Sequence, residues 1–499
     1  MTASPEQGSI RGLIARGGLW MAGSSLATRV TSFVAQIALG RLLSDEDFGV
    51  YAIAISIGAL ASVLRDGGAR QILIERGWRE REYIAPAFWL GGVLNVAAAG
   101  ALVAAGPLLQ GVYGESSLGL MLTFIASGLI LGTPSAVFRS KLSFELRMRD
   151  LATLNFVSAM LRYGGVIAFA VAGYGPLSFV IPIPLIVIVE GVLGYLYTRE
   201  QPWRMPPRVD LWRDVLLQMR WVVLGVGAVG VINMGPHMVI GLVLPTAVLG
   251  VYYFAFQIVL QVGAILSTNI NDVLFPSFVR IKEDRSRLGA GALEALQVTS
   301  LVAVLVCVLM ATAIAPLELL LWGGKWVSSV RPVQIMSLLY PFNVALAAGL
   351  AAQQATGEFR AWSLSLWGLA AVAMLTSYAG ALMTGSAVGV ALFGALSGAA
   401  ASVLYLVTMF RSLGVSGKTV VTVIARPWLI GSVASVAAIT LQIRLGSQLS
   451  ILATLILFPS LATGAVILLL RWLDPAAVQQ ILRVGQQQLG TKCGHRAGL

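Results

Sequence analysis

The chain consists of long apolar stretches that follow one another with few charges between them. Inside a bilayer the backbone must satisfy its own hydrogen bonds, and a spanning helix of about 20 apolar residues does so. We therefore expect an all-α polytopic membrane protein with about 14 transmembrane helices. The fourteen candidate segments are 18–39, 48–64, 84–106, 118–138, 153–173, 177–197, 220–243, 247–268, 292–315, 331–355, 361–382, 386–410, 427–443 and 449–470.

The composition excludes several other classes of protein. Only 11% of the 499 residues are charged and 57% are hydrophobic, whereas soluble proteins carry roughly 25% charged residues. This rules out an ordinary soluble fold, a disordered chain and, despite the net charge of +12, a nucleic-acid-binding domain. Cys307 and Cys493 lie far apart and predict neither a disulfide framework nor a metal site. We expect no metal and no cofactor.

The distribution of positive charge predicts the orientation in the membrane. With the N-terminus placed in the cytoplasm, 28 of the 34 lysines and arginines fall on the inner side and four on the outer side. Cytoplasmic loops of membrane proteins are enriched in these residues. We therefore expect both termini to be cytoplasmic. The outer loops are short, which leaves little room for an enzymatic domain outside the bilayer.

Two stretches of the chain resemble each other. Residues 39–54 and 240–255 align without gaps and share a glycine, a leucine and the run Gly-Val-Tyr. Six helices separate the copies, so they have one orientation, as in parallel transporter repeats; chance similarity of apolar helices is the alternative. The expected organisation is an N-lobe at 1–197, a cytoplasmic linker at 198–219, a C-lobe at 220–410, two further helices within 427–470 and an amphipathic cytoplasmic tail at 471–499.

Two arginines are expected near the centre of the bilayer. Arg29 and Arg162 each lie about ten residues into an apolar segment, where a charge costs at least about 2.5–3.5 kcal/mol unless it faces a cavity or a partner. Residues spaced by three or four share one helix face. Arg29 shares its face with Ser25, Ser32 and Gln36, and Arg162 shares its face with Asn155 and Ser158.

The repeat extends this polar surface to the second lobe. Ser32 and Gln36 correspond to Asn233 and His237 at the offset of 201 residues. We therefore expect a central cavity with a cationic N-lobe wall and a neutral polar C-lobe wall. Such a wall favours an anionic ligand, because guanidinium groups bind phosphate in a bidentate way.

Each of these assignments has a structural alternative. The two arginines could pair with an acid or with helix carbonyls, and Glu190 is the acid best placed to do so. Glu190 and Asp272 are also candidates for ion coupling, although Asp272 could simply cap a helix. His237 could be a proton relay or a hydrogen-bonded packing residue.

One acidic motif could indicate an enzyme. Asp45-Glu46-Asp47 has the spacing of a metal-dependent glycosyltransferase motif. It also follows Ser44 at the expected start of a helix, where acids stabilise the helix dipole. We expect helix capping and no catalytic residue.

The N-terminal region resembles a known family. The runs GRLLSDEDFGVYA and RDGGARQ, within residues 12–80, are similar to the bacterial polysaccharide transporter family, the Wzx-type flippases of the MOP superfamily. The resemblance implies two six-helix lobes in a V shape, alternating access, and a bacterial inner-membrane location. The implied cargo is an undecaprenyl-pyrophosphate-linked oligosaccharide for O-antigen, exopolysaccharide or capsule. It further implies that Arg29 and Arg162 hold the pyrophosphate. The implied partners of the protein are membrane lipids, a polysaccharide polymerase and a chain-length regulator.

Three other functions remain as alternatives. Related flippases with two extra helices carry a peptidoglycan precursor. A multidrug exporter of the same superfamily would need an acidic, aromatic cavity for cations. A polytopic glycosyltransferase or polymerase would act on the same lipid carrier and would need Asp45-Glu46-Asp47 as its metal site.

Overall fold

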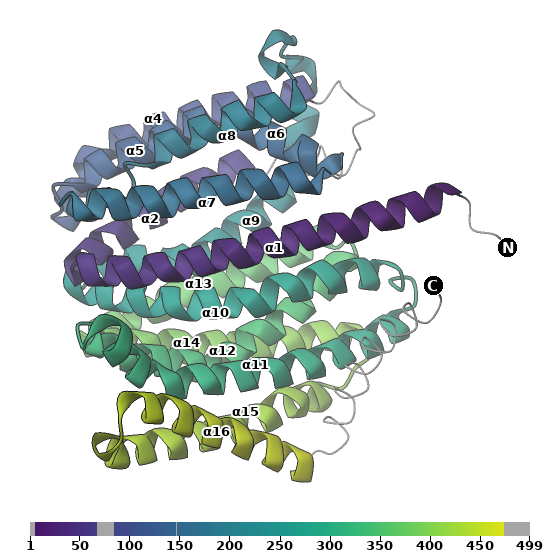
Figure 1. The fold of residues 1–499 in the computed structure, drawn as a ribbon. Helices are drawn as coiled ribbons and strands as arrows, with labels where there is room; N and C mark the ends of the chain where they lie inside the picture. The colour runs from purple at the N-terminus through teal and green to yellow at the C-terminus, as the bar shows by residue number, and fades with distance from the viewer. Residues whose placement is uncertain (1–4, 67–83, 146, 474–499) are drawn as a thin grey trace. The chain divides into compact units, whose positions relative to one another are not determined.

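The computed structural model describes residues 5–66, 84–145 and 147–473, and every regular element in these ranges is a helix. The chain forms two compact units, Met1–Tyr253 and Phe254–Leu499. Figure 1 shows the helices of both units with their labels. The expected tail at 474–499 lies outside the described residues.

Unit 1 contains the helices of the N-terminal half of the chain, together with the first turns of α10. Short 3-10 turns, labelled η, connect some of them. The elements are α1 (Pro5–Leu42), α2 (Asp45–Asp66), α4 (Ile84–Tyr113), α5 (Leu118–Leu131), α6 (Thr133–Phe144), α7 (Met148–Val171), η2 (Gly175–Phe179), α8 (Ile183–Thr198), η3 (Pro202–Arg204), η4 (Val209–Leu211) and α9 (Trp212–Gly241).

Unit 2 contains the remaining helices and most of α10. They are α10 (Thr246–Val279), α11 (Arg285–Trp322), α12 (Val327–Ala355), α13 (Phe359–Thr384), α14 (Ala387–Ser412), α15 (Gly417–Leu445), η5 (Gly446–Gln448) and α16 (Ile451–Leu473).

Most of these helices could cross a membrane. Eleven described helices are long and apolar enough, or twelve if the bent pair α5 and α6 forms one span. The segments 18–39 and 48–64 are helical as expected, within α1 and α2, but are not among those eleven. The all-α class is confirmed, whereas the count of fourteen spans and the expected lobe boundaries stay predictions.

Two glycines of the sequence repeat meet in unit 1, where α2 crosses the first turns of α10. A Cβ added to Gly49 would lie 1.9 Å from the carbonyl oxygen of Thr246, and one added to Gly250 would lie 1.7 Å from that of Asp45. Small residues let membrane helices approach backbone to backbone. Glycine is therefore required at both positions.

Aromatic residues surround this crossing. Tyr51 stacks on Phe179 with ring centroids 3.9 Å apart and meets Tyr253 edge to face at 5.8 Å. Phe48 meets Phe179 at 5.3 Å. Aromatic pairs at these separations contribute about 0.5–1.5 kcal/mol each beyond their burial, so the cluster stabilises the end of unit 1 where α2 begins.

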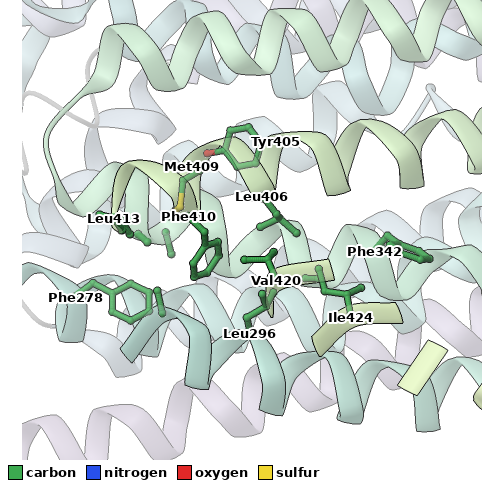
Figure 2. Packing of buried hydrophobic residues seen from close by; sticks show 14 of the residues in the cluster. Phe278, Leu296, Phe342, Tyr405, Leu406, Met409, Phe410, Leu413, Val420 and Ile424 are labelled. Atoms are coloured by element: carbon green, nitrogen blue, oxygen red, sulfur yellow. The ribbon is translucent and has the colours of Figure 1, made fainter. Parts of the chain in front are cut away.

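The core of unit 2 joins α10, α11, α12, α14 and α15 (Figure 2). Leu296, Leu406, Phe410 and Val420 are fully buried in it. A second apolar cluster joins α11 to α15 and α16 through Val304, Val308, Ala434, Ala462 and other residues. The two C-terminal helices are thus packed onto α11 within unit 2.

Candidate functional site

The two helices expected to carry polar stripes lie side by side. α1 packs along α7 in unit 1 (Figure 1). The Ser24 hydroxyl donates to the carbonyl oxygen of Ala152 at 2.9 Å, and the Arg149 guanidinium lies 5.5 Å from the Trp20 ring centroid. These contacts bring the faces of Arg29 and Arg162 to the same region of unit 1.

A polar hollow of about 380 Å³ opens between α1, α6, α7 and α8. It contains six of the residues expected from the sequence: Ser25, Arg29, Asn155, Ser158, Arg162 and Glu190. The described residues that line it are Ser24, Ser25, Thr28, Arg29, Arg139, Asn155, Ser158, Ala159, Arg162, Tyr163 and Glu190.

Arg139 is a site residue that the sequence analysis missed, because it was placed in an inner loop. It lies on α6, and its Nη2 donates to Oε1 of Glu190 at 2.6 Å while its Nη1 donates to Oδ1 of Asn155 at 2.6 Å. The Glu190 side chain is 11% exposed and that of Arg139 is 32% exposed. Glu190 therefore pairs with Arg139, in place of the two arginines for which it was considered.

A bend in the chain explains why Arg139 reaches the hollow. The segment 118–138, expected as one straight span, is two helices, α5 and α6, bent by 49°. The bend falls at Gly132, and Pro134 follows at the start of α6, where a missing N–H costs little. The Asn95 side chain donates to the Thr133 hydroxyl at 2.9 Å and fixes the bend from α4. The run Gly-Thr-Pro at residues 132–134 was the sequence signal that could have predicted this bend.

The hollow carries an excess of positive charge. The described part of its lining has three guanidinium groups, on Arg29, Arg139 and Arg162, and one carboxylate, on Glu190, which is paired with Arg139. Arg29 is half-buried, and the Arg162 side chain is exposed to the hollow. Within the described part of the chain Arg162 forms no ion pair. The arrangement suits an anion that accepts hydrogen bonds from several guanidinium groups.

The remaining polar residues of the two stripes lie outside this hollow. Ser32 and Gln36 continue the α1 face beyond the lining, and the Gln36 Nε2 atom is buried with no hydrogen-bond partner among the described residues. Asn233 donates to the carbonyl oxygen of Val229 in its own helix at 2.8 Å. The Asp272 side chain lies outside the part of the chain whose side chains are described.

His237 is buried against two tyrosines in this structure, and its expected role stays a prediction. It is fully buried, and its ring centroid lies 5.6 Å from that of Tyr252 and 5.2 Å from that of Tyr253. Both tyrosines belong to the first turns of α10.

Asp45-Glu46-Asp47 begins α2 as expected. The Asp47 N–H donates to the Ser44 hydroxyl oxygen at 3.1 Å, and the Ser44 N–H donates to Oδ2 of Asp47 at 2.9 Å. This reciprocal pair is a capping box. Among the described residues there is no group of three histidines, cysteines or acids that could hold a metal ion.

Comparison with known families identifies the class of protein. The family described as "Polysaccharide biosynthesis protein" matches residues 38–331, which is more than half of the chain. The chain belongs to this family, as the N-terminal resemblance predicted.

Two relatives carry names that refer to polysaccharide biosynthesis, and one of them is named as a transport protein. The succinoglycan biosynthesis transport protein ExoT of Rhizobium meliloti is 26% identical over 315 residues, covering 62% of each chain. The lipopolysaccharide biosynthesis protein WzxC of Escherichia coli is 22% identical over 349 residues, covering 66% of this chain and 68% of the relative. The chain thus spans about two thirds of the length of these relatives. The expectation of a transporter and not an enzyme agrees with them.

Two solved structures share the fold. The lipid II flippase MurJ in an inward closed conformation aligns over 91% of this chain and 99% of its own, with a TM-score of 0.72 and 12% identity. An inward-facing multidrug resistance MATE transporter of the MOP superfamily aligns over 78% of this chain and 94% of its own, with a TM-score of 0.61 and 14% identity. The chain therefore has the MOP fold.

Proposed function

We propose that the protein is a flippase that moves an undecaprenyl-pyrophosphate-linked oligosaccharide from the inner to the outer leaflet of the cytoplasmic membrane. The cargo would serve the synthesis of a surface polysaccharide such as O-antigen, exopolysaccharide or capsule. The observation that carries the proposal is the hollow of unit 1 with its three arginines and single carboxylate. Alternating access would expose this hollow to one leaflet and then to the other.

The charge of the hollow fits a pyrophosphate diester. A pyrophosphate esterified at both ends keeps one negative charge on each phosphate, and the guanidinium groups of the described lining can donate hydrogen bonds to both phosphates. Guanidinium groups stay charged at any physiological pH and bind phosphate oxygens in pairs. In this proposal Arg29 and Arg162 bind the phosphates directly, and Glu190 holds Arg139 toward the same space.

The volume of the hollow limits what it can contain. About 380 Å³ lies at the small end of ordinary ligand sites, which measure roughly 300–1,000 Å³. It accommodates a charged headgroup better than an entire oligosaccharide. We propose that the hollow selects the pyrophosphate, which every repeat unit carries, and leaves the sugars outside it.

The membrane orientation and the partners belong to the same proposal. The 28 to 4 bias of lysine and arginine supports cytoplasmic termini in a bacterial inner membrane. The polymerase and the chain-length regulator would receive the cargo at the outer face. Roles in ion coupling for Glu190 and Asp272 stay predictions, as do substrate contacts from Ser25, Ser32, Gln36, Asn155, Asn233 and His237.

The alternatives differ in what they need from the site. A peptidoglycan precursor carries the same pyrophosphate and would fit the same hollow. A cationic drug would be repelled by the guanidinium groups that line the hollow. A glycosyltransferase would need Asp45 and Asp47 free to bind a metal, whereas Asp47 is engaged with Ser44 in a capping box.

The test is complementation of a deletion strain with wild type, Arg29→Ala, Arg162→Ala and Arg162→Lys. The readouts are the amount of surface polysaccharide and the leaflet in which lipid-linked repeat units accumulate. We expect units trapped in the inner leaflet with either alanine variant and partial export with Arg162→Lys. Arg213→Ala removes an exposed charge of the same unit outside the hollow and is the matched control.

The alternatives are separated in the same assay. Normal export by both alanine variants would refute the arginine site. Units that reach the outer leaflet but stay unpolymerised would identify an outer-face enzyme or its partner. Loss of peptidoglycan precursor flipping with intact polysaccharide export would assign the protein to the other pyrophosphate cargo.

A further inference from the structure

A second polar hollow, of about 340 Å³, lies in unit 2 where α11 runs beside the first turns of α15. It is formed by residues that the proposed flippase site does not use. α15 contributes Lys418, Thr419, Thr422 and Arg426, and α11 contributes Gln297 and Leu301.

The two cations of this hollow lie on one face of α15. Lys418, Thr422 and Arg426 follow at steps of four residues, so they form a stripe along the helix. The stripe is about 12 Å long at 1.5 Å per residue. Helical side chains lean toward the helix N-terminus, so Arg426 leans toward Thr422 and Lys418. Both cations can therefore reach a single bound group.

No carboxylate lies among the described residues that line this hollow. The sequence contains no aspartate or glutamate from residue 359 to residue 473, which covers α13 to α16. A third cation is close by, because a Cβ added to Gly417 would lie 3.1 Å from Nε of Arg411. The described helices α13 to α16 thus contribute three cations and no acid to this end of α15.

The depth of the stripe matches the headgroup region of a membrane. α15 has 29 residues and is about 43 Å long, whereas the hydrocarbon core is about 30 Å thick. Its first turns therefore extend into the headgroup layer. Arg426 lies deeper, and its long side chain can extend back to that layer.

The same face of α15 becomes apolar beyond Arg426. Leu429, Val433 and Val436 continue the stripe at steps of three and four, and their exposed fractions are 53%, 65% and 55%. A cationic hollow followed by exposed aliphatic residues matches a molecule with a phosphate at one end and acyl chains at the other. A soluble phosphate has no apolar group that could contact these aliphatic residues.

We propose that this hollow binds the headgroup of an anionic phospholipid, with its phosphate at Lys418 and Arg426 and its acyl chains along Leu429 and Val433. The lipid belongs to the leaflet at which α15 begins, which the charge distribution predicts to be the cytoplasmic one. Basic pockets between membrane helices on that side bind anionic headgroups in other membrane proteins.

The test is native mass spectrometry of the full-length protein in detergent with equal amounts of phosphatidylglycerol and phosphatidylcholine. We expect wild type to retain phosphatidylglycerol at least about fivefold over phosphatidylcholine, since each cation near the surface contributes about 1 kcal/mol. Lys418→Gln/Arg426→Gln should abolish the preference, and the charge-conserving pair Lys418→Arg/Arg426→Lys should keep it. Arg444→Gln, at the opposite end of α15, is the control and should keep it as well.

Two further arms make the result decisive. Thr422→Trp fills the hollow without changing the charge and should also reduce phosphatidylglycerol binding. This variant tests the proposal independently if the double variant fails to fold. Inorganic phosphate in tenfold excess should displace no lipid. A preference that survives both Lys418→Gln/Arg426→Gln and Thr422→Trp would overturn the proposal, and so would an equal loss with Arg444→Gln or displacement by inorganic phosphate.

Discussion

Nη2 of Arg139 lies 2.6 Å from Oε1 of Glu190, and this ion pair joins α6 to α8 at the wall of the hollow in unit 1. Glu190 offsets one of three positive charges and also holds the guanidinium in place. Asn155 accepts the second hydrogen bond from Arg139. The carboxylate is therefore part of the geometry of the cationic wall.

Replacing Glu190 by Gln should destabilise the protein. Breaking a fully buried ion pair costs about 3–5 kcal/mol, and the partial exposure of Arg139 reduces this to about 1–3 kcal/mol. Thermal unfolding of the purified protein in detergent measures the loss. In a double-mutant cycle, Arg139→Gln/Glu190→Gln should be more stable than the sum of the single losses predicts, because the charges are removed together. Strict additivity would show that the ion pair contributes nothing.

Removal of either unit 1 arginine should slow transport. Truncating one partner of a desolvated charge contact costs about 2–5 kcal/mol, and partial solvation places this site near the lower end, so Arg162→Ala should reduce flipping by about 30-fold. Arg29→Ala should have a similar effect. The double variant should lose less than the product of the two, because both residues would bind one ligand. Flipping of a fluorescent lipid-linked saccharide in proteoliposomes measures each rate, with Arg213→Ala as the unaffected control.

Substitution of Gly49 or Gly250 by Ala should disrupt unit 1. The added Cβ would lie within 2 Å of a backbone oxygen, and relieving such a clash costs about 1–3 kcal/mol or more. We expect reduced yield of folded protein and a lower unfolding temperature. Gly100 lies inside α4 with no atom within 4 Å of an added Cβ. Gly100→Ala should be neutral or stabilise by up to about 1 kcal/mol, and an equal loss at Gly100 would contradict the explanation.

The acidic motif at the start of α2 should be dispensable for transport. Ser44→Ala removes the capping hydroxyl and should cost about 0.5–2 kcal/mol of stability. Asp47→Ala should cost a similar amount, since it breaks the same reciprocal contact. Both variants should export polysaccharide normally per folded molecule in the complementation strain. Export that fails while the folded protein accumulates at wild-type levels would instead support an enzymatic role.

Much of the unit 1 site was predictable because a charge in an apolar helix is costly and therefore placed for a reason. Arg29 and Arg162 were identified because each lies about ten residues into an apolar segment. The spacing of three and four residues then added Ser25 and Asn155, and all four line the hollow. Glu190 followed as the acid within the neighbouring apolar segment.

The remaining features depend on tertiary structure. Arg139 was assigned to a loop because the apolar count ends at residue 138, and only the 49° bend at Gly132 turns α6 back toward α7 and α8. His237 was assigned to the cavity because the repeat was read as an equivalence of helix faces. In the structure its ring lies against Tyr252 and Tyr253, which are neighbours that the sequence repeat could not predict.

The crossing of Gly49 and Gly250 also restricts how the two copies of the repeat can diverge. At most positions, duplicated segments accumulate different residues independently. Here the backbone of each copy occupies the space in which the other would place a side chain, so a substitution in one copy is rejected by its counterpart. Paired glycines 201 positions apart should therefore outlast most other identities between the two copies, and they offer a way to locate the duplication in relatives whose internal similarity has otherwise disappeared.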